Sequence, residues 1–448
     1  MKNTEFSIAR LYLYSALLLL VLGLCFGLLG AIVYVKPDFL KDNLGFVSLR
    51  PMHVSSVLFW ILLGATGGIY ASLHALVPGF QKPGLAKLQW VLWLIAIAGI
   101  YGSYITKNFG GREYWEFTPI WALPIGMAWL FFVWNVLRVL RRIKDWPVYL
   151  WMWLTGSVFF FFIFIENYLW LFPYFRQHFV SDMTIQWKVN GSIVGAWNQL
   201  LYGALFYLMD RISGNTGTGR SKLAFFMYFL GLFNLMFNWG HHIYTLPTQA
   251  YVKYVGYAVS MTEWIFLIKI IYNWRSTVSA AQKHGHYFPY RFVMASDFWV
   301  FINLLQALMM SIPAINIYTH GTHVTVAHAM GTTIGINSMI LLALCFEFLL
   351  PSKQNEGTRP GILNFAYWTL QVSLFIFWLS LLLAGIKKGL WQMSATQTVY
   401  SKMMDSLQPY FISFLVAGCA LFLALFVLAG ILVKPLFTKR QPEAARNA

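Results

Sequence analysis

The chain has 448 residues, of which 59% are hydrophobic and only 10% are charged, and its formal net charge is +17. About a quarter of the residues in a soluble globular domain are charged, so this composition excludes a soluble protein and predicts an integral membrane protein. The Lys and Arg residues lie in short segments between apolar runs, such as "RVLRRIKD". The positive charge therefore favours contacts with lipid headgroups, and we expect no nucleic-acid partner.

Apolar runs of roughly 20 residues recur along the whole chain, and each is long enough to cross a hydrocarbon core as a helix. They predict an all-α integral membrane fold of about twelve helices in a single domain over residues 1–448, with a short cytoplasmic tail from about 434. The expected spans are 8–35, 51–78, 86–107, 119–141, 148–172, 187–211, 222–246, 250–275, 292–317, 322–350, 362–387 and 408–433.

The charge pattern predicts the orientation of the chain. The first span lacks a small-residue cleavage site, so we expect it to be a retained helix. With the N-terminus inside, the cytoplasmic loops carry the excess of Lys and Arg, which predicts two cytoplasmic termini in a bacterial-type inner membrane. The three cysteines are isolated in apolar runs and no C-x-x-C-H occurs, so no covalently attached c-type haem is expected on this chain.

Histidines from distant parts of the chain fall at the same depth of the predicted bundle. His53 begins the second span, His241 and His242 end the seventh, and "HGTH" (320–323) begins the tenth. Because the spans alternate in direction, all of these imidazoles are expected in the outer third of the bilayer. Buried polar side chains are costly in a membrane, so this convergence predicts a shared metal or haem site.

The tenth span carries two further candidate ligands, His328 and Met330. Residues at positions i and i+2 of a helix lie about 200° apart, so these two side chains face different neighbours. Imidazole and thioether are both axial ligands of haem iron. We therefore expect one haem on His328 and another between His53 and Met330. His323, about 10 Å further out on nearly the same face as Met330, is an alternative ligand, and an open or absent site is another.

Adjacent His241 and His242 follow Gly240 at the expected end of a helix. At such a frayed end both rings can turn toward one metal ion, although two interfacial histidines bonded to water remain the other interpretation.

Four segments, "MHVSSVLFW", "GGREYWE", "GHHIY" and "THGTHVTVAH", resemble motifs of the haem-copper oxidase superfamily, and within it the catalytic subunit of nitric oxide reductases. The resemblance implies a subunit I-like bundle with two b-type haems and a non-haem metal, for which iron is favoured over copper. It implies the following ligands: His53 for the low-spin haem, His328 for the high-spin haem, and His241 and His242 for the non-haem metal.

Two carboxylates also match the family. Glu113 in "GREYWE" is similar to a residue that binds calcium near the haem propionates, with Arg112 beside it as a cofactor contact; a hard cation prefers such oxygens. A plain ion pair is the alternative for Glu113. Glu263 in "SMTEWIF" resembles a membrane carboxylate that delivers protons or positions the ligand.

The sequence departs from the family at several ligand positions. In "VNGSIVGAWNQ", Asn190, Val194 and Asn198 stand where the family has a third metal-binding histidine and two glutamates. Met330 stands where the family has a second histidine. Asn190 offers an amide oxygen, a harder and weaker ligand than imidazole, and we keep it as the third candidate ligand of the non-haem metal.

The implied function is that of a redox enzyme acting on nitric oxide, with electrons from a separate c-type cytochrome or cupredoxin-like subunit. The lost carboxylates leave two alternatives open: a nitric oxide dismutase, which converts two NO to N2 and O2, and a catalytically reduced haem-binding paralogue, sensor or partner subunit. A transporter that uses His and Glu as proton relays does not explain the convergence. An oxygen reductase needs a tyrosine joined to a metal-binding histidine, and no spacing assigns that role to Tyr244, Tyr251, Tyr254 or Tyr257.

Overall fold

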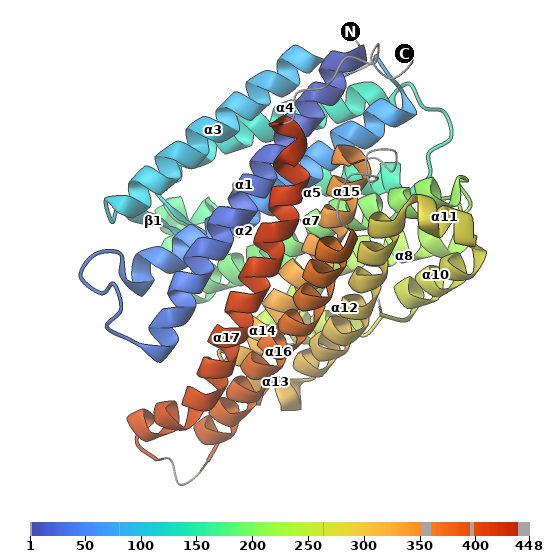
Figure 1. Ribbon diagram of the computed structural model, residues 1–448. Helices are drawn as coiled ribbons and strands as arrows, with labels where there is room; N and C mark the ends of the chain where they lie inside the picture. Colours follow the sequence, from blue (N-terminus) through green and yellow to red (C-terminus); the bar gives the residue numbers. More distant parts are fainter. Residues whose placement is uncertain (1, 80, 263, 351–359, 395–397, 438–448) are drawn as a thin grey trace.

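The computed structural model describes all residues except 1, 80, 263, 351–359, 395–397 and 438–448. Long helices lie side by side in one bundle, with the start of α1 and the end of α17 at the same end of it (Figure 1). The long elements are α1 (Lys2–Val35), α2 (Gly45–Leu76), α3 (Pro83–Ile105), α4 (Ala122–Leu140), α5 (Val148–Glu166), α7 (Phe179–Ser213), α8 (Lys222–Phe237), α9 (Ala250–Ser260), α10 (Trp264–Thr277), α12 (Tyr287–Ser311), α14 (His323–Met330), η4 (Gly331–Ser338), α15 (Met339–Leu349), α16 (Pro360–Gln392) and α17 (Tyr400–Val433).

Short elements connect the long helices. The helical connections are η1 (Pro119–Trp121), η2 (Leu169–Leu171), α6 (Pro173–Arg176), η3 (Asn238–Ile243), α11 (Ala280–Gly285), α13 (Pro313–Thr319) and η6 (Lys434–Leu436). An antiparallel hairpin of β1 (Phe109–Arg112) and β2 (Trp115–Phe117) joins α3 to η1. Tyr114 adopts a φ of 72° at the tip of this hairpin, a left-handed conformation that reverses the chain direction.

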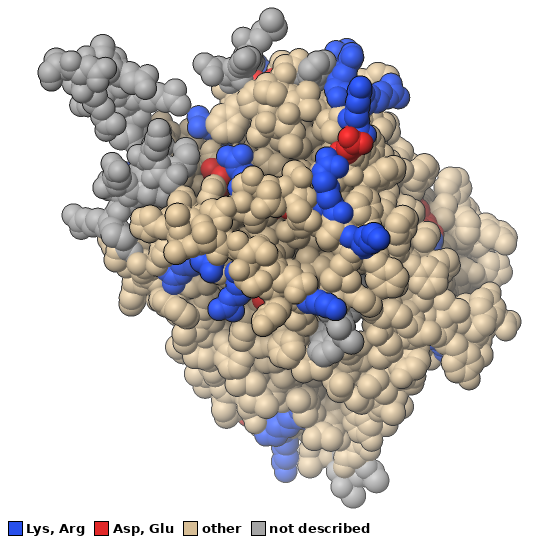
Figure 2. Space-filling model, turned by 90° about the vertical axis from the view of Figure 1, so that its right-hand side faces the viewer, with Lys and Arg blue, Asp and Glu red and all other residues tan. Residues whose placement is uncertain are grey.

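The predicted helical membrane fold is confirmed. Within the described residues, ten helical segments are long and apolar enough to cross a membrane. The other two predicted spans, 187–211 and 250–275, correspond to α7 and to the pair α9 and α10. The second of these is therefore two helices instead of one. Figure 2 shows Lys and Arg gathered over the end of the molecule where α1 begins, with a broad uncharged zone beneath them, as a membrane protein requires.

The burial of the helices separates the centre of the bundle from its rim. In α2, 89% of the most apolar window is buried, and in the stretch from α14 to α15 the share is 78%. In α1 and in α3 the corresponding share is only 33%. Hence α2 and α14–α15 form the centre, and the outer helices face lipid.

A fixed register joins these two central helices. The indole Nε1 of Trp60 on α2 donates a hydrogen bond of 2.9 Å to the hydroxyl of Ser338 at the end of η4. Two turns further along α2, Gly68 lies against the side chain of Leu344 on α15. Both helices advance together from one contact to the next, so they run parallel.

The segment η4 is a π-helix that directly follows Met330. Gly331 and Gly335 in this segment lie against Asn303 and Trp299 of α12, where a larger residue would not fit. Single-turn π segments within helices are frequent at functional sites. The residues after the predicted haem ligands are thus held between α2 on one side and α12 on the other.

Candidate functional site

The predicted site residues on α2, η3 and α14 lie toward the end of the bundle remote from the start of α1 (Figure 1). This arrangement follows from the alternating direction of the helices: α2 begins at that end, α8 runs into η3 there, and α14 begins there. Separate contacts hold the rings of His53, His241 and His242.

A backbone carbonyl fixes the ring of His53. Its Nδ1 lies 2.7 Å from the carbonyl oxygen of Gly23 on α1. Because a carbonyl only accepts, Nδ1 carries the proton in a neutral ring and Nε2 keeps its lone pair. Gly27, one turn further along α1, lets the ring approach: a Cβ there would lie 2.7 Å from Nδ1. This support leaves Nε2 as the nitrogen available to a metal.

The register between α2 and the central helix brings His53 near the level of Met330. His53 precedes Trp60 by seven residues, which is about two turns and places both side chains on nearly the same face of α2. That face contacts Ser338 at Trp60. The two helices are parallel, so two turns before Trp60 on α2 correspond to about two turns before Ser338 on the central helix. That position is the junction of Met330 and η4. Met330 itself is partly buried and packs on the main core.

The rings of His241 and His242 lie together on the 3-10 segment η3, with their centroids 4.2 Å apart. The Nδ1 atom of His241 is 3.0 Å from the hydroxyl of Ser260 on α9. That hydroxyl donates its one proton to the carbonyl of Gly256 over 2.7 Å, so it accepts from His241. The Nε2 atom of His241 therefore keeps its lone pair and is the nitrogen that could bind a metal.

Glycine-to-glycine packing holds η3 against α9. A Cβ on Gly256 would lie 2.7 Å from the Cα of Gly240. This close approach sets Ser260, one turn after Gly256, beside His241. The sequence pattern assigns to Gly240 a frayed helix end. In the structure, Gly240 allows the close approach of η3 to α9 at Gly256.

His242 lies between α7 and the start of the central helix. Trp187 of α7 stacks on His242, with a centroid distance of 6.2 Å and an interplanar angle of 13°, and also contacts His320 at 5.6 Å. His328 is close enough to both rings of the pair to interact with them electrostatically. The structure thus brings His241, His242 and His328 together and adds His320, to which the sequence pattern assigns no ligand role. Burial lowers the pKa of His320, which favours its neutral form.

Asn190 is buried on α7, next to the glycine that faces His242. Its Nδ2 donates to Glu113 Oε2 over 3.3 Å, whereas its Oδ1 has no partner. An unpartnered buried amide oxygen is costly, and it is the atom expected to bind a metal. Among the residues that the structure describes, no group of three or more His, Cys, Asp or Glu side chains is arranged to hold a metal ion.

The hairpin carries an ion-pair cluster that the sequence did not reveal. Arg50 at the start of α2 binds Glu113 and Glu116, with N–O distances of 3.0 Å and 2.8 Å. Both oxygens of Glu113 thus have protein partners, in agreement with the ion-pair alternative. Burial raises the pKa of Glu116 although Arg50 opposes this effect. Arg50 precedes His53 by about one helical turn. Its ion pairs therefore hold the hairpin against the start of α2, close to His53.

The Nη2 atom of Arg112 in the hairpin donates to both carboxylate oxygens of Asp182 on α7, at 2.7 Å and 2.8 Å. Its guanidinium also lies 4.9 Å from the ring of Trp170. Asp182 could not be assigned from sequence because no motif surrounds it.

His323 lies among aromatic rings of α1 and α17, with centroid distances of 5.8 Å to Tyr34 and 5.2 Å to Phe411. Its role as the alternative haem ligand stays a prediction. Glu263, the predicted membrane carboxylate, falls outside the described residues.

The chain is similar to known respiratory proteins over most of its length. It is 23% identical to a nitric oxide reductase subunit of Stutzerimonas stutzeri over 413 residues, which cover 85% of this chain and 84% of the relative. It is also similar to cytochrome c oxidase subunit 1 of Rhodobacter capsulatus, with 22% identity over 421 residues, 88% of this chain and 77% of the relative.

A solved heme-copper terminal oxidase dimer has the same fold, with a TM-score of 0.77 at 14% identity over 99% of this chain and 86% of that one. This likeness confirms the expected subunit I-like bundle. Residues 7–420 match the family described as Cytochrome C and Quinol oxidase polypeptide I. With the convergence of histidines at one end of this bundle, the match shows that the chain belongs to the subunit I family of haem-copper oxidases.

Proposed function

We propose that this chain is the catalytic subunit of a membrane-bound oxidoreductase that acts on nitric oxide. The observation that carries the proposal is the pair His241 and His242 beside His328, with the amide of Asn190 on the adjoining helix in place of a third imidazole. The family comprises oxidoreductases that use haems and a further metal, and one of the relatives is a nitric oxide reductase subunit.

The residues present fit the haems and the iron, whereas calcium at Glu113 would have to displace Arg50 and Asn190, which hold its two oxygens. The Nε2 atoms of His53 and His241 are left free by bonds at Nδ1, and Asn190 Oδ1 lacks a partner. The proposed assignments are His53 and Met330 for a low-spin b-type haem, His328 for a high-spin b-type haem, His241, His242 and Asn190 for a non-haem iron, Arg112 for a haem contact, and Glu113 for calcium. When bound, the haems and the iron supply the one-electron chemistry that NO requires.

The protein's own contribution is to hold the ligands in one protonation state and orientation. Gly23 and Ser260 each accept a hydrogen bond from Nδ1 of a histidine, so the ligand nitrogen needs no further deprotonation. Trp187 stacks on one face of His242. In this scheme Glu263 remains the proposed proton donor.

The tyrosines near the histidine pair favour NO over O2 as the substrate. The hydroxyl of Tyr244 donates to the backbone carbonyl of Ser311 over 2.8 Å, away from the histidine rings. The other three candidates are exposed at the surface of α9: Tyr251, Tyr254 and Tyr257. Because an oxygen reductase uses a tyrosine joined to a metal-binding histidine, these placements support NO as the substrate.

Dismutation of NO is the second candidate, and α7 gives it specific support. The side-chain oxygens of Asn190, Asn198 and Gln199 are all buried without partners, and Val194 lies in the same segment. These groups are amides, which do not release protons. Reduction of two NO to N2O and water consumes two protons and two electrons, whereas dismutation of two NO to N2 and O2 consumes neither.

Gas analysis tests the function. The protein, purified with any subunit that accompanies it, is given isotopically labelled NO anaerobically, with or without ascorbate and a soluble c-type cytochrome. We expect one N2O per two NO, formed only with reductant, abolished in His241→Ala and retained in His284→Ala, a control at an exposed residue of α11. Labelled N2 and O2 without reductant would establish the dismutase instead. Intact haems with no gas turnover would contradict both reactions and favour a sensor or partner subunit.

The tight contact at Gly27 tests the role of His53. In Gly27→Ala the new methyl group collides with the imidazole, so we expect the low-spin haem band in the reduced-minus-oxidised spectrum to be lost or shifted. Gly30→Ala on the same helix is the matched control, because a Cβ there meets nothing within 4 Å. An unchanged low-spin band in Gly27→Ala would argue against His53 as the ligand.

Ser260 tests the metal pair without touching a ligand. Ser260→Ala removes the group that fixes the tautomer of His241, and loss of such a partner lowers metal affinity by about 10–100-fold. We expect this loss in metal titrations of the purified protein, while both haem spectra stay unchanged. Ser276→Ala, which removes a hydroxyl bonded only locally on α10, is the control. Equal metal affinity in the two variants would exclude a positioning role for Ser260.

A further inference from the structure

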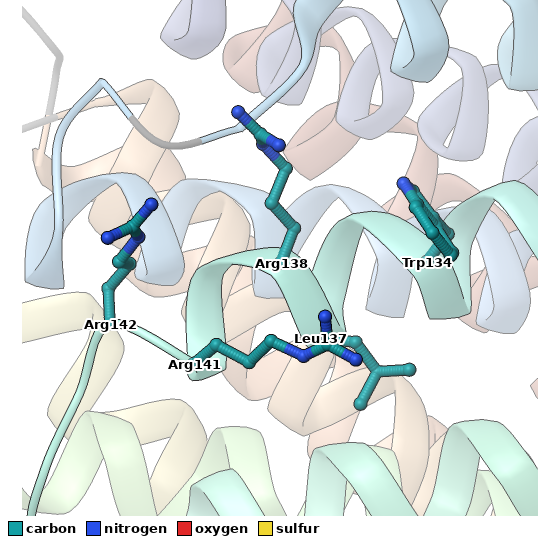
Figure 3. A pocket seen from close by; sticks show the side chains of 5 residues that line it. All are labelled: Trp134, Leu137, Arg138, Arg141 and Arg142. Carbon is teal, nitrogen blue, oxygen red and sulfur yellow. The ribbon is translucent and has the colours of Figure 1, made fainter.

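Buried polar side chains within the membrane span need partners, unlike those at its ends. In Figure 3, Arg138, Arg141 and Arg142 line a hollow of about 290 Å³ at the end of α4, a position typical of the membrane interface. Asn303 is different: it is 1% exposed and lies within the apolar span of α12, more than two helical turns from either end. An amide at that depth is costly unless each of its polar atoms is hydrogen-bonded.

The amide of Asn303 finds its partners on the central helix, beside the proposed haem ligands. The oxygen and nitrogen of an amide are distinguished by their hydrogen bonds, and one orientation satisfies both atoms. In that orientation Nδ2 donates to the carbonyl of His328 over 3.1 Å, and Oδ1 accepts from the backbone N–H and the hydroxyl of Thr332 over 3.2 Å and 2.7 Å. The Thr332 hydroxyl also lies 3.2 Å from the His328 carbonyl, but its one proton goes to the nearer oxygen.

The two backbone groups that the amide contacts would bond to each other in an ordinary α-helix. There the carbonyl of residue i accepts from the N–H of residue i+4, and Thr332 follows His328 by four residues. The helix changes from α to π bonding at Gly331, between these two residues. A side chain that enters the hydrogen-bond ladder is a known cause of irregular helices, so the amide and the π segment belong together.

Two glycines allow α12 to come this close to the central helix. Gly331 lies against the amide of Asn303, and Gly335, one turn later, lies against the ring of Trp299, one turn earlier on α12. A Cβ at either glycine would collide with its neighbour. The backbone of Asn303 also hydrogen-bonds the imidazole of His328. The same residue therefore holds both the ring and the main chain of this proposed ligand.

We propose that Asn303 is a positioning residue for both haems, an inference that rests on the haem ligands proposed above. Its amide takes the place of the direct bond between His328 and Thr332 and so keeps the following segment in the π form. A π-helix bonds each residue to the fifth one along instead of the fourth, and each residue added to a helix turns the parts on either side by about 100°. Met330 lies between the two bonded residues, so the direction of its thioether depends on Asn303.

Haem spectroscopy of the purified Asn303→Leu variant tests this role. Leucine is close to asparagine in size but makes neither hydrogen bond, so the helix should close to α bonding and turn Met330 away from the iron. We expect both haems to remain bound, the near-infrared band of thioether-ligated ferric haem to be lost, and the midpoint potential of that haem to fall, because a Met/His pair raises it. The iron–histidine stretching band of the other haem in resonance Raman spectra should shift. Ser296→Ala, which removes a buried hydroxyl bonded to Val293 in its own helix, should leave these signals unchanged.

Unchanged haem signals in Asn303→Leu would overturn the positioning role. If this variant does not fold, Thr332→Val, which removes the hydroxyl that holds Oδ1, is compared with Thr106→Val, whose hydroxyl bonds to carbonyls of α3. The potential should then fall only in Thr332→Val, and equal potentials would contradict the proposal. If the unmodified protein lacks the thioether band, the assignment of Met330 as a haem ligand fails instead. Cryo-electron microscopy then tests the backbone role alone: Asn303→Leu should lose the π bonding of residues 331–338, and its retention would exclude that role.

Discussion

The parallel packing of α2 against the central helix formed by α14, η4 and α15 is the constraint on which the rest of the site depends. The hydrogen bond from Trp60 to Ser338 and the contact of Gly68 with Leu344 fix the register of these helices. Both helices are largely buried, so neither can slide without opening the core. Their register determines that His53 and the proposed ligand Met330 of the tenth predicted span share one level of the bundle.

Burying imidazoles in a membrane bundle is costly unless each ring has a hydrogen-bond partner. For two of the rings the structure supplies a partner at Nδ1: a backbone carbonyl for His53 and a hydroxyl for His241. These bonds lower the cost of burial and at the same time leave Nε2 as an unprotonated nitrogen. For these two rings, burial and the proposed metal binding therefore favour the same orientation.

The sequence predicted the helical fold and the convergence of histidines because both depend on simple patterns, hydrophobic length and alternating direction. It did not reveal Ser260, Trp187 or Arg50, since a serine, a tryptophan or a loop arginine has no pattern that marks a neighbour far along the chain. The break between α9 and α10 was also missed, because no proline or glycine marks it in the sequence. Glu113 shows the limit of a motif: the same carboxylate fits a calcium ion or the arginine that the structure places beside it.

The haem content of the His328→Ala variant tests the central claim most directly. Haem extraction, visible spectra and electron paramagnetic resonance of the purified protein should give two b-type haems per chain, one low-spin and one high-spin. The variant should keep the low-spin signal and lose the high-spin one, because His53 and Met330 are untouched. Loss of the low-spin signal with retention of the high-spin haem, or absence of haem from the unmodified protein, would contradict the account.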